Sequence, residues 1–146
     1  MTFSEIIGDI FTSPVNNTII HCVSADKALG KGIALSIKNE YPNMIPSFNN
    51  TTFEIGKAYG FTNHTDKRSI INLVTKNRYY EKPTYSSLEQ SLYSAKELII
   101  SHNIKRIAMP RIGCGLDRLD WDRVAYLISE IFNHLDIEIT IYIISK

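Results

Sequence analysis

The segment PRIGCGLDRL, residues 110–119, is the most informative part of this sequence. Residues 104–108, just before this segment, predict a strand, and a helical pattern follows the segment. Gly113 and Gly115 stand at alternate positions, where a missing side chain lets the backbone turn sharply or approach a phosphate. Asp117 comes next, where a strand delivers side chains to a cleft. These residues predict a ligand loop between a strand and a helix.

Outward from this loop, short apolar runs alternate with helical patterns, which is typical of an α/β fold. One helix carries Ile33, Ile37 and Tyr41 four residues apart, and Pro42 stops it. Residues 43–50 predict only a loop. Two later helices have apolar stripes at positions 88, 92, 95 and 99 and at positions 124, 127, 128, 131 and 135. The predicted strands cover residues 18–23, 53–61, 69–74, 104–108 and 137–144.

The length of 146 residues fits one domain with one packed interior. We expect a single domain over residues 1–146, a three-layer α/β/α sandwich around a mixed central sheet. A net charge of +1 gives no support for a broad electrostatic attraction to nucleic acid. The longest apolar run, residues 137–144, is interrupted by Glu138 and Thr140, so we expect no association with a membrane.

The N-terminus lacks the pattern of a secretory signal, so we expect an intracellular protein, cytoplasmic or, in a eukaryote, nuclear. Cys22 and Cys114 belong to no paired-cysteine motif and are expected to be reduced and structural. The histidines have no metal-ligand spacing. We expect neither a metal nor a cofactor.

A second glycine loop, Gly30-Lys31-Gly32, also follows a strand and precedes a helix. Ligands of open α/β sheets bind beyond the carboxyl ends of strands, where helix N-termini offer unpaired N–H groups. Two such loops could hold a diphosphate between them. Glycine also serves ordinary turn geometry, so each loop alone leaves a purely structural role open.

Three charged residues are candidates for chemistry, each with a simpler alternative. Asp9 could accept a hydrogen bond from an amine such as that of adenine, or could satisfy its own turn backbone. Lys76 ends a buried strand, where a partly desolvated amine can act as a nucleophile, although a solvated charge is the commoner outcome. Asp117 could be an acid/base group, or an acid favoured by the start of a helix.

Together these segments resemble the macrodomain family, and within it the branch typified by terminal ADP-ribose protein glycohydrolase. The matching segments span nearly the full chain: GDIF (residues 8–11), HCVS (21–24), GKGIA (30–34), TK (75–76), KPTY (82–85), PRIGCGLDRL (110–119) with Trp121, and ITIY (139–142). Of these, PRIGCGLDRL is the most specific.

The resemblance implies an ADP-ribose site with Lys76 and Asp117 as the catalytic pair. In that family the lysine attacks the anomeric carbon of the distal ribose, a carboxylate leaves, and the aspartate assists release of the covalent lysyl intermediate. Asp9 and Tyr142 would lie at the adenine end, and Ser24 near the distal ribose. The ligand-binding residues implied are Asp9, Ile10, His21, Ser24, Gly30, Gly32, Ile33, Ala34, Thr75, Pro110, Arg111, Ile112, Gly113, Cys114, Gly115, Leu116 and Tyr142.

The chain departs from the larger hydrolytic macrodomain branch, whose first ligand loop has an Asn pair and a triple glycine. Here the corresponding segments are Ser24-Ala25-Asp26 and Gly30-Lys31-Gly32. This difference argues against the water-based mechanism of that branch.

The leading hypothesis is a hydrolase that removes mono-ADP-ribose from acidic Glu or Asp side chains, with O-acyl-ADP-ribose and nucleobase-linked ADP-ribose as further candidate substrates. The alternatives are a non-catalytic ADP-ribose reader and an ADP-ribose 1″-phosphate phosphatase. The expected partners are ADP-ribose and ADP-ribosylated protein, and we expect a monomer. An ADP-ribosylated nucleic acid is a further candidate partner. The basic and aromatic residues that would contact it are Lys76, Arg78, Tyr79, Tyr80, Lys82 and Tyr85. The simpler alternative is that these residues form a solvated surface loop.

Overall fold

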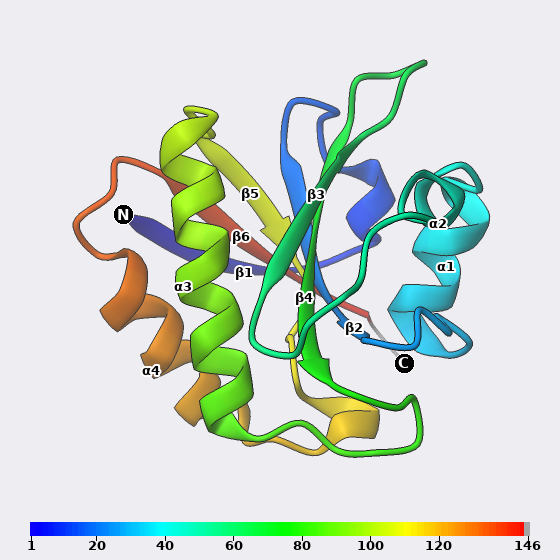
Figure 1. Cartoon of the computed structure of the whole chain (residues 1–146). Coiled ribbons are helices and arrows are strands. Elements are labelled where there is room, and N and C mark those ends of the chain that lie inside the picture. The colour runs from blue at the N-terminus through cyan, green and yellow to red at the C-terminus, as the bar shows by residue number, and fades with distance from the viewer. Residues whose placement is uncertain (145–146) are drawn as a thin grey trace.

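A computed structural model describes residues 1–144 as a six-stranded sheet between two groups of helices (Figure 1). The strands are β1 (Thr2–Ile7), β2 (Thr18–Ser24), β3 (Ala58–Thr62), β4 (Ser69–Lys76), β5 (Arg106–Met109) and β6 (Glu138–Ile143). The helices are α1 (Gly32–Glu40), α2 (Met44–Ser47), α3 (Tyr85–Ser101) and α4 (Trp121–Phe132), with two 3₁₀ turns, η1 (Ile10–Thr12) and η2 (Gly115–Asp117). The last two residues of the predicted domain range lie outside the described part.

The strand order is β1-β6-β5-β2-β4-β3. Every neighbouring pair is parallel except β3 and β4, so the predicted mixed sheet is confirmed. The carboxyl ends of the five parallel strands therefore lie at one edge of the sheet. This edge carries the loops that follow β2, β4 and β5, which are the predicted ligand-binding segments.

Successive residues of the central strands point to opposite faces of the sheet, as the pleat requires. Ile20, Ile71 and Ile107 pack under α3 and α4, and their neighbours Ile19, Ile70 and Ala108 pack under α1, α2 and η1. Two cores separated by one sheet make the three layers that the sequence predicts, with α3 and α4 on one face and α1 and α2 on the other (Figure 1).

The two long helices begin at side-chain caps. Thr84 accepts a hydrogen bond from the Ser87 N–H, and Ser87 Oγ accepts one from the Thr84 N–H, which forms a capping box at the start of α3. Asp120 accepts from the Arg123 N–H at the start of α4. None of the helices in residues 1–144 is long and apolar enough to cross a membrane.

The structure corrects the prediction in four places. β1 was not predicted, because five of its six residues are exposed and show no apolar alternation. The strand predicted over 53–61 begins only at Ala58, since Gly56 turns the chain with φ +85°. The loop predicted over 43–50 contains α2, whose Pro46 lies in the first helical turn, where proline is tolerated. Leu135 lies beyond the end of α4.

Candidate active site

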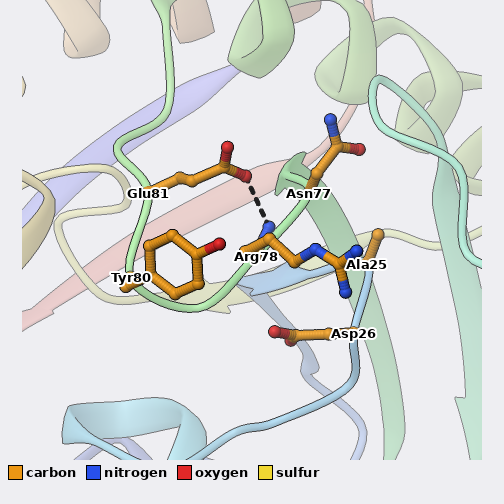
Figure 2. Close-up of a pocket in the computed structure, with 6 residues that line it drawn as sticks. All are labelled: Ala25, Asp26, Asn77, Arg78, Tyr80 and Glu81. Atoms are coloured by element: carbon orange, nitrogen blue, oxygen red, sulfur yellow. Dashed lines mark hydrogen bonds between the residues drawn. The ribbon is translucent and has the colours of Figure 1, made fainter.

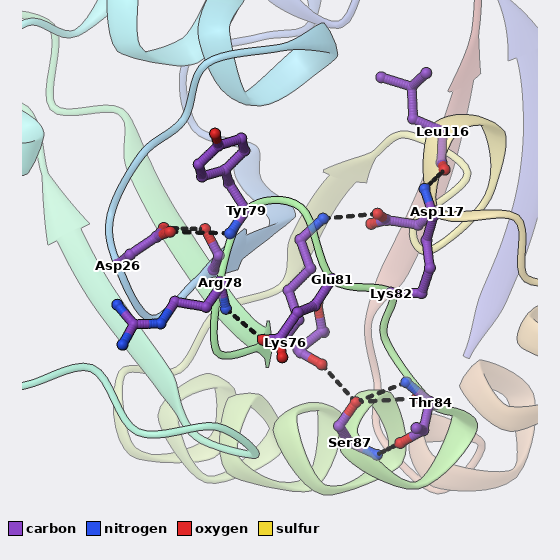
Figure 3. A network of polar contacts seen from close by, with 12 residues as sticks. Asp26, Lys76, Arg78, Tyr79, Glu81, Lys82, Thr84, Ser87, Leu116 and Asp117 are labelled. Carbon is purple, nitrogen blue, oxygen red and sulfur yellow. Dashed lines mark hydrogen bonds and ion pairs between the residues drawn. The ribbon is translucent and has the colours of Figure 1, made fainter.

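Lys76 and Asp117 form an ion pair at the carboxyl edge of the sheet (Figure 3). Lys76 is the last residue of β4, Asp117 is the last residue of η2, and Lys76 Nζ lies 2.8 Å from Asp117 Oδ1. The side chains are 15% and 18% exposed, so both are largely enclosed yet reachable by a ligand. Ion pairs that solvent still reaches contribute about 1 kcal/mol or less to stability. Stability alone therefore gives little reason for this arrangement.

Positive backbone angles shape the turn that carries Asp117. Gly113 and Gly115 have φ of +73° and +71°, and Arg118, directly after Asp117, has φ +65°. The turn closes through hydrogen bonds from the Leu119 N–H to the Gly113 carbonyl at 2.8 Å and from the Arg118 N–H to the Gly115 carbonyl at 3.1 Å. A side chain at position 113 would also meet Leu119 Cδ1 at 2.8 Å. The loop conformation thus depends on glycine.

The two glycine loops lie side by side. Gly32 begins α1 with φ +59°, and a Cβ placed on it would lie 3.9 Å from Leu116 Cδ1 of the second loop. Leu116 itself is 63% exposed. The structure therefore brings together the two segments that the sequence predicted as partners in ligand binding.

Two helices at this edge, α1 and η2, begin without the side-chain caps that α3 and α4 have. Neither Lys31, which precedes α1, nor Cys114, which precedes η2, makes a side-chain capping hydrogen bond. The first N–H groups of a helix have no partner within the helix, and they carry partial positive charge. Two such starts next to each other form a suitable site for an anionic group such as a diphosphate.

Asp26 organises the first loop. It accepts hydrogen bonds from Ser24 Oγ and from the Ala28 N–H, and it accepts a third from the Tyr79 N–H at 2.9 Å. Burial raises the pKa of Asp26, but these hydrogen bonds outweigh burial and hold the pKa below its ordinary value. Ser24, predicted near the distal ribose, is buried and donates its hydroxyl to this carboxylate.

The residues predicted at the adenine end also lie together. Asp9 is exposed and accepts a hydrogen bond from the Phe11 N–H at 3.0 Å, so it does cap its own turn. The adjacent Gly8 bonds to the Ile143 carbonyl, and a Cβ placed on Gly8 would lie 3.9 Å from the Tyr142 ring. Asp9 and Tyr142 therefore belong to one corner of the edge.

Several predicted ligand residues lie beneath the cleft instead of lining it with side chains. Ile10, Thr75 and Ile112 are buried. His21 is fully buried, and its Nε2 lies 2.6 Å from Asn72 Oδ1. Burial lowers the pKa of His21 to about 4, so the ring is neutral at neutral pH. Ile33 and Ala34 are partly buried at the start of α1, and they pack against the core on that face.

Arg111 turns its side chain away from the cleft. Its guanidinium lies 3.4 Å from Glu5 Oε1 and 5.6 Å from the centre of the Trp121 ring. Trp121 donates its indole N–H to the same Glu5 oxygen at 2.8 Å. Arg111 thus contacts the protein itself through Glu5 and Trp121, and no signal in the sequence indicates this orientation. Its neighbour Pro110 is half-buried.

Both cysteines are free thiols in partly buried positions. Burial raises the pKa of Cys22 to about 12, and the negative charge of Asp117 adds to this effect. Burial likewise raises the pKa of Cys114 to about 11. Both groups stay protonated at neutral pH, which agrees with the structural role expected of them. In residues 1–144, no group of His, Cys, Asp or Glu side chains could hold a metal ion.

A hollow of about 430 Å³ is lined by Ala25 and Asp26 after β2 and by residues of the loop after β4, which are Asn77, Arg78, Tyr80 and Glu81 (Figure 2). Of the residues predicted to contact nucleic acid, Arg78 and Tyr80 line it. Lys82 and Tyr85 have partners within the protein, because Lys82 Nζ donates to the Leu116 carbonyl and the Tyr85 hydroxyl accepts from the Asp120 N–H. Sequence reasoning did not anticipate these two contacts, nor the presence of Glu81 in the hollow.

The fold and the site define a macrodomain, and the chain belongs to this family: residues 12–128 match the Macro domain. Among curated proteins it is similar to ADP-ribose glycohydrolase OARD1 of Homo sapiens, with 38% identity over 135 residues that cover 92% of this chain and 87% of that protein. It is also similar to DNA ADP-ribosyl glycohydrolase of Mycobacterium tuberculosis, with 28% identity over 92% of this chain and 40% of that protein.

Solved structures agree with the family. The macrodomain of Mycobacterium tuberculosis DarG superimposes with a TM-score of 0.88 at 26% identity, covering 97% of each chain. Thermosipho africanus DarTG in complex with ADP-ribose superimposes with a TM-score of 0.83 at 26% identity, covering 97% of this chain and 41% of that one.

Proposed function

We propose that this macrodomain is an ADP-ribosyl glycohydrolase that removes mono-ADP-ribose from an acceptor, with Lys76 as the nucleophile and Asp117 as the acid/base. The observation that carries the proposal is the Lys76–Asp117 ion pair beside two glycine loops, whose helices α1 and η2 begin without a side-chain cap. A reader needs the loops and an adenine contact but has no need of an enclosed amine paired with a carboxylate. The names of the relatives, ADP-ribose glycohydrolase and DNA ADP-ribosyl glycohydrolase, support a hydrolase over a reader.

The ligand would lie along the carboxyl edge of the sheet. The diphosphate would occupy the starts of α1 and η2, where backbone N–H groups are available. The adenine would lie toward Asp9 and Tyr142. This placement brings the distal ribose to Lys76 and Asp117.

The chemistry follows from the two side chains. Lys76 passes a proton to Asp117, and the neutral amine attacks the anomeric carbon of the distal ribose. The bond from Nζ to that carbon forms as the glycosidic bond breaks. The acceptor leaves with the bonding electron pair and takes the proton that Asp117 holds, so Asp117 is a carboxylate again. Water then adds to the same carbon while Asp117 accepts a proton from it, the bond to Nζ breaks with its electron pair on the nitrogen, and Asp117 returns the proton to the amine. ADP-ribose and a free acceptor are the products.

Changing Lys76 to Ala should abolish this turnover. We expect release of ADP-ribose from a defined Glu-linked substrate to fall by a factor of about 10³ or more, because the covalent path is lost. The dissociation constant of ADP-ribose should stay within about threefold, since the loops would supply most of the binding. The measurements are chromatographic product analysis and calorimetric titration.

A matched control is Lys105→Ala, which removes an exposed lysine after α3 and should keep wild-type turnover. Mass spectrometry of wild-type enzyme quenched during turnover should find ADP-ribose on Lys76. Wild-type turnover by Lys76→Ala would overturn the covalent mechanism, and binding of ADP-ribose without turnover by the wild type would make the protein a reader.

A nucleic-acid acceptor is the second candidate. Tyr79 and Tyr80 are 60% and 69% exposed beside Arg78 in the loop after Lys76, where unpaired bases could stack. One relative is named for DNA ADP-ribosyl hydrolysis. Rates on matched Glu-linked and DNA-linked substrates decide between the acceptors. The Glu-linked protein remains our first candidate, with the enzyme acting as a monomer inside the cell.

A further inference from the structure

We propose that Lys82 is a positioning residue that fixes Asp117 against Lys76, an inference that rests on the catalytic pair proposed above. Lys82 Nζ donates a hydrogen bond of 2.6 Å to the carbonyl oxygen of Leu116, the residue before Asp117 (Figure 3). An ammonium donor strengthens such a bond relative to a neutral donor. The contact therefore acts on the backbone that carries the aspartate, and not on the carboxylate itself.

The turn that holds Asp117 needs this support. η2 is one turn long, and left-handed residues bound it, Gly115 at its start and Arg118 directly after its end. The last carbonyl groups of a helix have no partner within the helix. Lys82 supplies a partner to Leu116 from a different segment of the chain. Without it, the backbone bonds of the turn and the ion pair with Lys76 would be the contacts left to hold Asp117 in place.

The backbone next to Lys82 is fixed by the start of α3. Pro83 after it is buried, and Thr84 begins the capping box of α3. Ser87 of that box donates its hydroxyl to the Thr75 carbonyl at 2.6 Å. Thr75 is buried and directly precedes Lys76, so the start of α3 is tied to the end of β4.

These contacts form a closed ring through both catalytic residues. It runs from Lys76 through Thr75 to Ser87 and Thr84, along the chain to Lys82, across to Leu116, and through Asp117 back to Lys76 (Figure 3). Two links of this ring cross to the second glycine loop, the side-chain bond of Lys82 and the ion pair of Lys76 with Asp117. Its ammonium already has a partner, which favours a role through Asp117 over direct contact with the substrate.

The test compares Lys82→Met, which keeps the length but removes the charge, with Lys82→Arg, which restores a donor. We expect kcat of Lys82→Met to fall about 10- to 100-fold, because displacements of about 1 Å in a catalytic group have effects of this size. KM and the dissociation constant of ADP-ribose should stay within about twofold. Lys82→Arg should recover most of the activity, and Lys105→Met should behave as wild type.

Amide hydrogen exchange gives a second readout that does not depend on turnover. Exchange of the Asp117, Arg118 and Leu119 amides should accelerate in Lys82→Met and return toward wild type in Lys82→Arg, while α4 keeps its protection. If the wild type turns over no ADP-ribosyl substrate, the proposed function fails, and hydrogen exchange still tests the ring. Unchanged kcat, unchanged exchange, or a raised KM at constant kcat would overturn the positioning role.

Discussion

At the scale of single residues, the proposed mechanism uses the carboxylate of Asp117 twice as a base. It would accept a proton from Lys76 and later one from water, so its basicity should matter far more to turnover than to folding. A largely enclosed ion pair with 18% exposure of the carboxylate still meets solvent, and its loss should cost about 1 kcal/mol or less. Activity and stability can therefore be separated at this position.

Asp117→Asn keeps the shape of the side chain and removes its basicity. We expect kcat to fall by a factor of about 10² to 10⁴, the usual contribution of a general acid or base. The midpoint of urea unfolding should change little. The control is Asp136→Asn, an exposed carboxylate between α4 and β6. Near-wild-type kcat in Asp117→Asn would exclude Asp117 as the acid/base.

At the scale of elements, the second ligand loop depends on its backbone angles. Two of its glycines, together with Gly30 of the first loop, differ in how much strain a side chain would introduce. Gly113→Ala meets both a positive φ and Leu119 Cδ1 at 2.8 Å, Gly115→Ala meets a positive φ in open space, and Gly30 has open space and no positive φ. A left-handed non-glycine residue costs about 1–2 kcal/mol, and overpacking adds about 1–3 kcal/mol.

The free energy of unfolding should therefore fall most for Gly113→Ala, by about 2–5 kcal/mol, and by about 1–2 kcal/mol for Gly115→Ala. Gly30→Ala should be close to neutral. Chemical denaturation monitored by circular dichroism measures all three variants. Equal stability of Gly113→Ala and Gly30→Ala would show that the loop does not need the left-handed angle.

Elements with strong apolar stripes could be predicted from the sequence, and exposed or short ones could not. α3 and α4 were predicted because their buried residues recur at helical spacing. β1 lies at the sheet edge with mostly exposed side chains, and α2 has only four residues, so neither leaves a periodic pattern.

At the site too, some features could be predicted from the sequence and others could not. Lys76 and Asp117 are 41 positions apart, yet each follows a strand, and parallel strands bring their carboxyl ends to one edge. The direction of Arg111 and the Lys82 contact depend on side-chain torsions, for which the sequence contains no periodic signal. The burial of His21 depends on which face of β2 is covered and on its bond to Asn72.

At the scale of the whole molecule, His21 makes folding sensitive to acid. It bonds to Asn72 in the centre of the sheet, and Asn72 bonds in turn to the Tyr59 carbonyl of β3. The pKa of His21 is lowered from 6.5 to about 4 by burial. Between these values the unfolded chain binds a proton that the folded chain does not, so stability falls as the pH drops from about 6.5 to about 4.

We expect His21 to contribute a loss of about 3 kcal/mol over that interval, since each pKa unit corresponds to about 1.4 kcal/mol. The free energy of unfolding, measured by urea titration at several pH values, should therefore depend less steeply on pH in His21→Gln than in the wild type. His64→Gln, at an exposed histidine in the β3–β4 turn, is the matched control. Parallel pH profiles of His21→Gln and wild type would contradict the assignment.

The missing caps at Lys31 and Cys114 have a consequence for how the cleft could be closed to its ligand. Lys31 has the extended backbone, φ −147° and ψ 157°, from which Ser or Asp caps a helix. The side chain of an acidic residue at that position would accept hydrogen bonds from the first N–H groups of α1, which in the proposed complex bind a phosphate. Because this carboxylate would be tethered to the loop, it would compete with a phosphate at a high effective concentration. Replacing Lys31 by Asp would thus block the proposed phosphate site with a side chain of the protein itself.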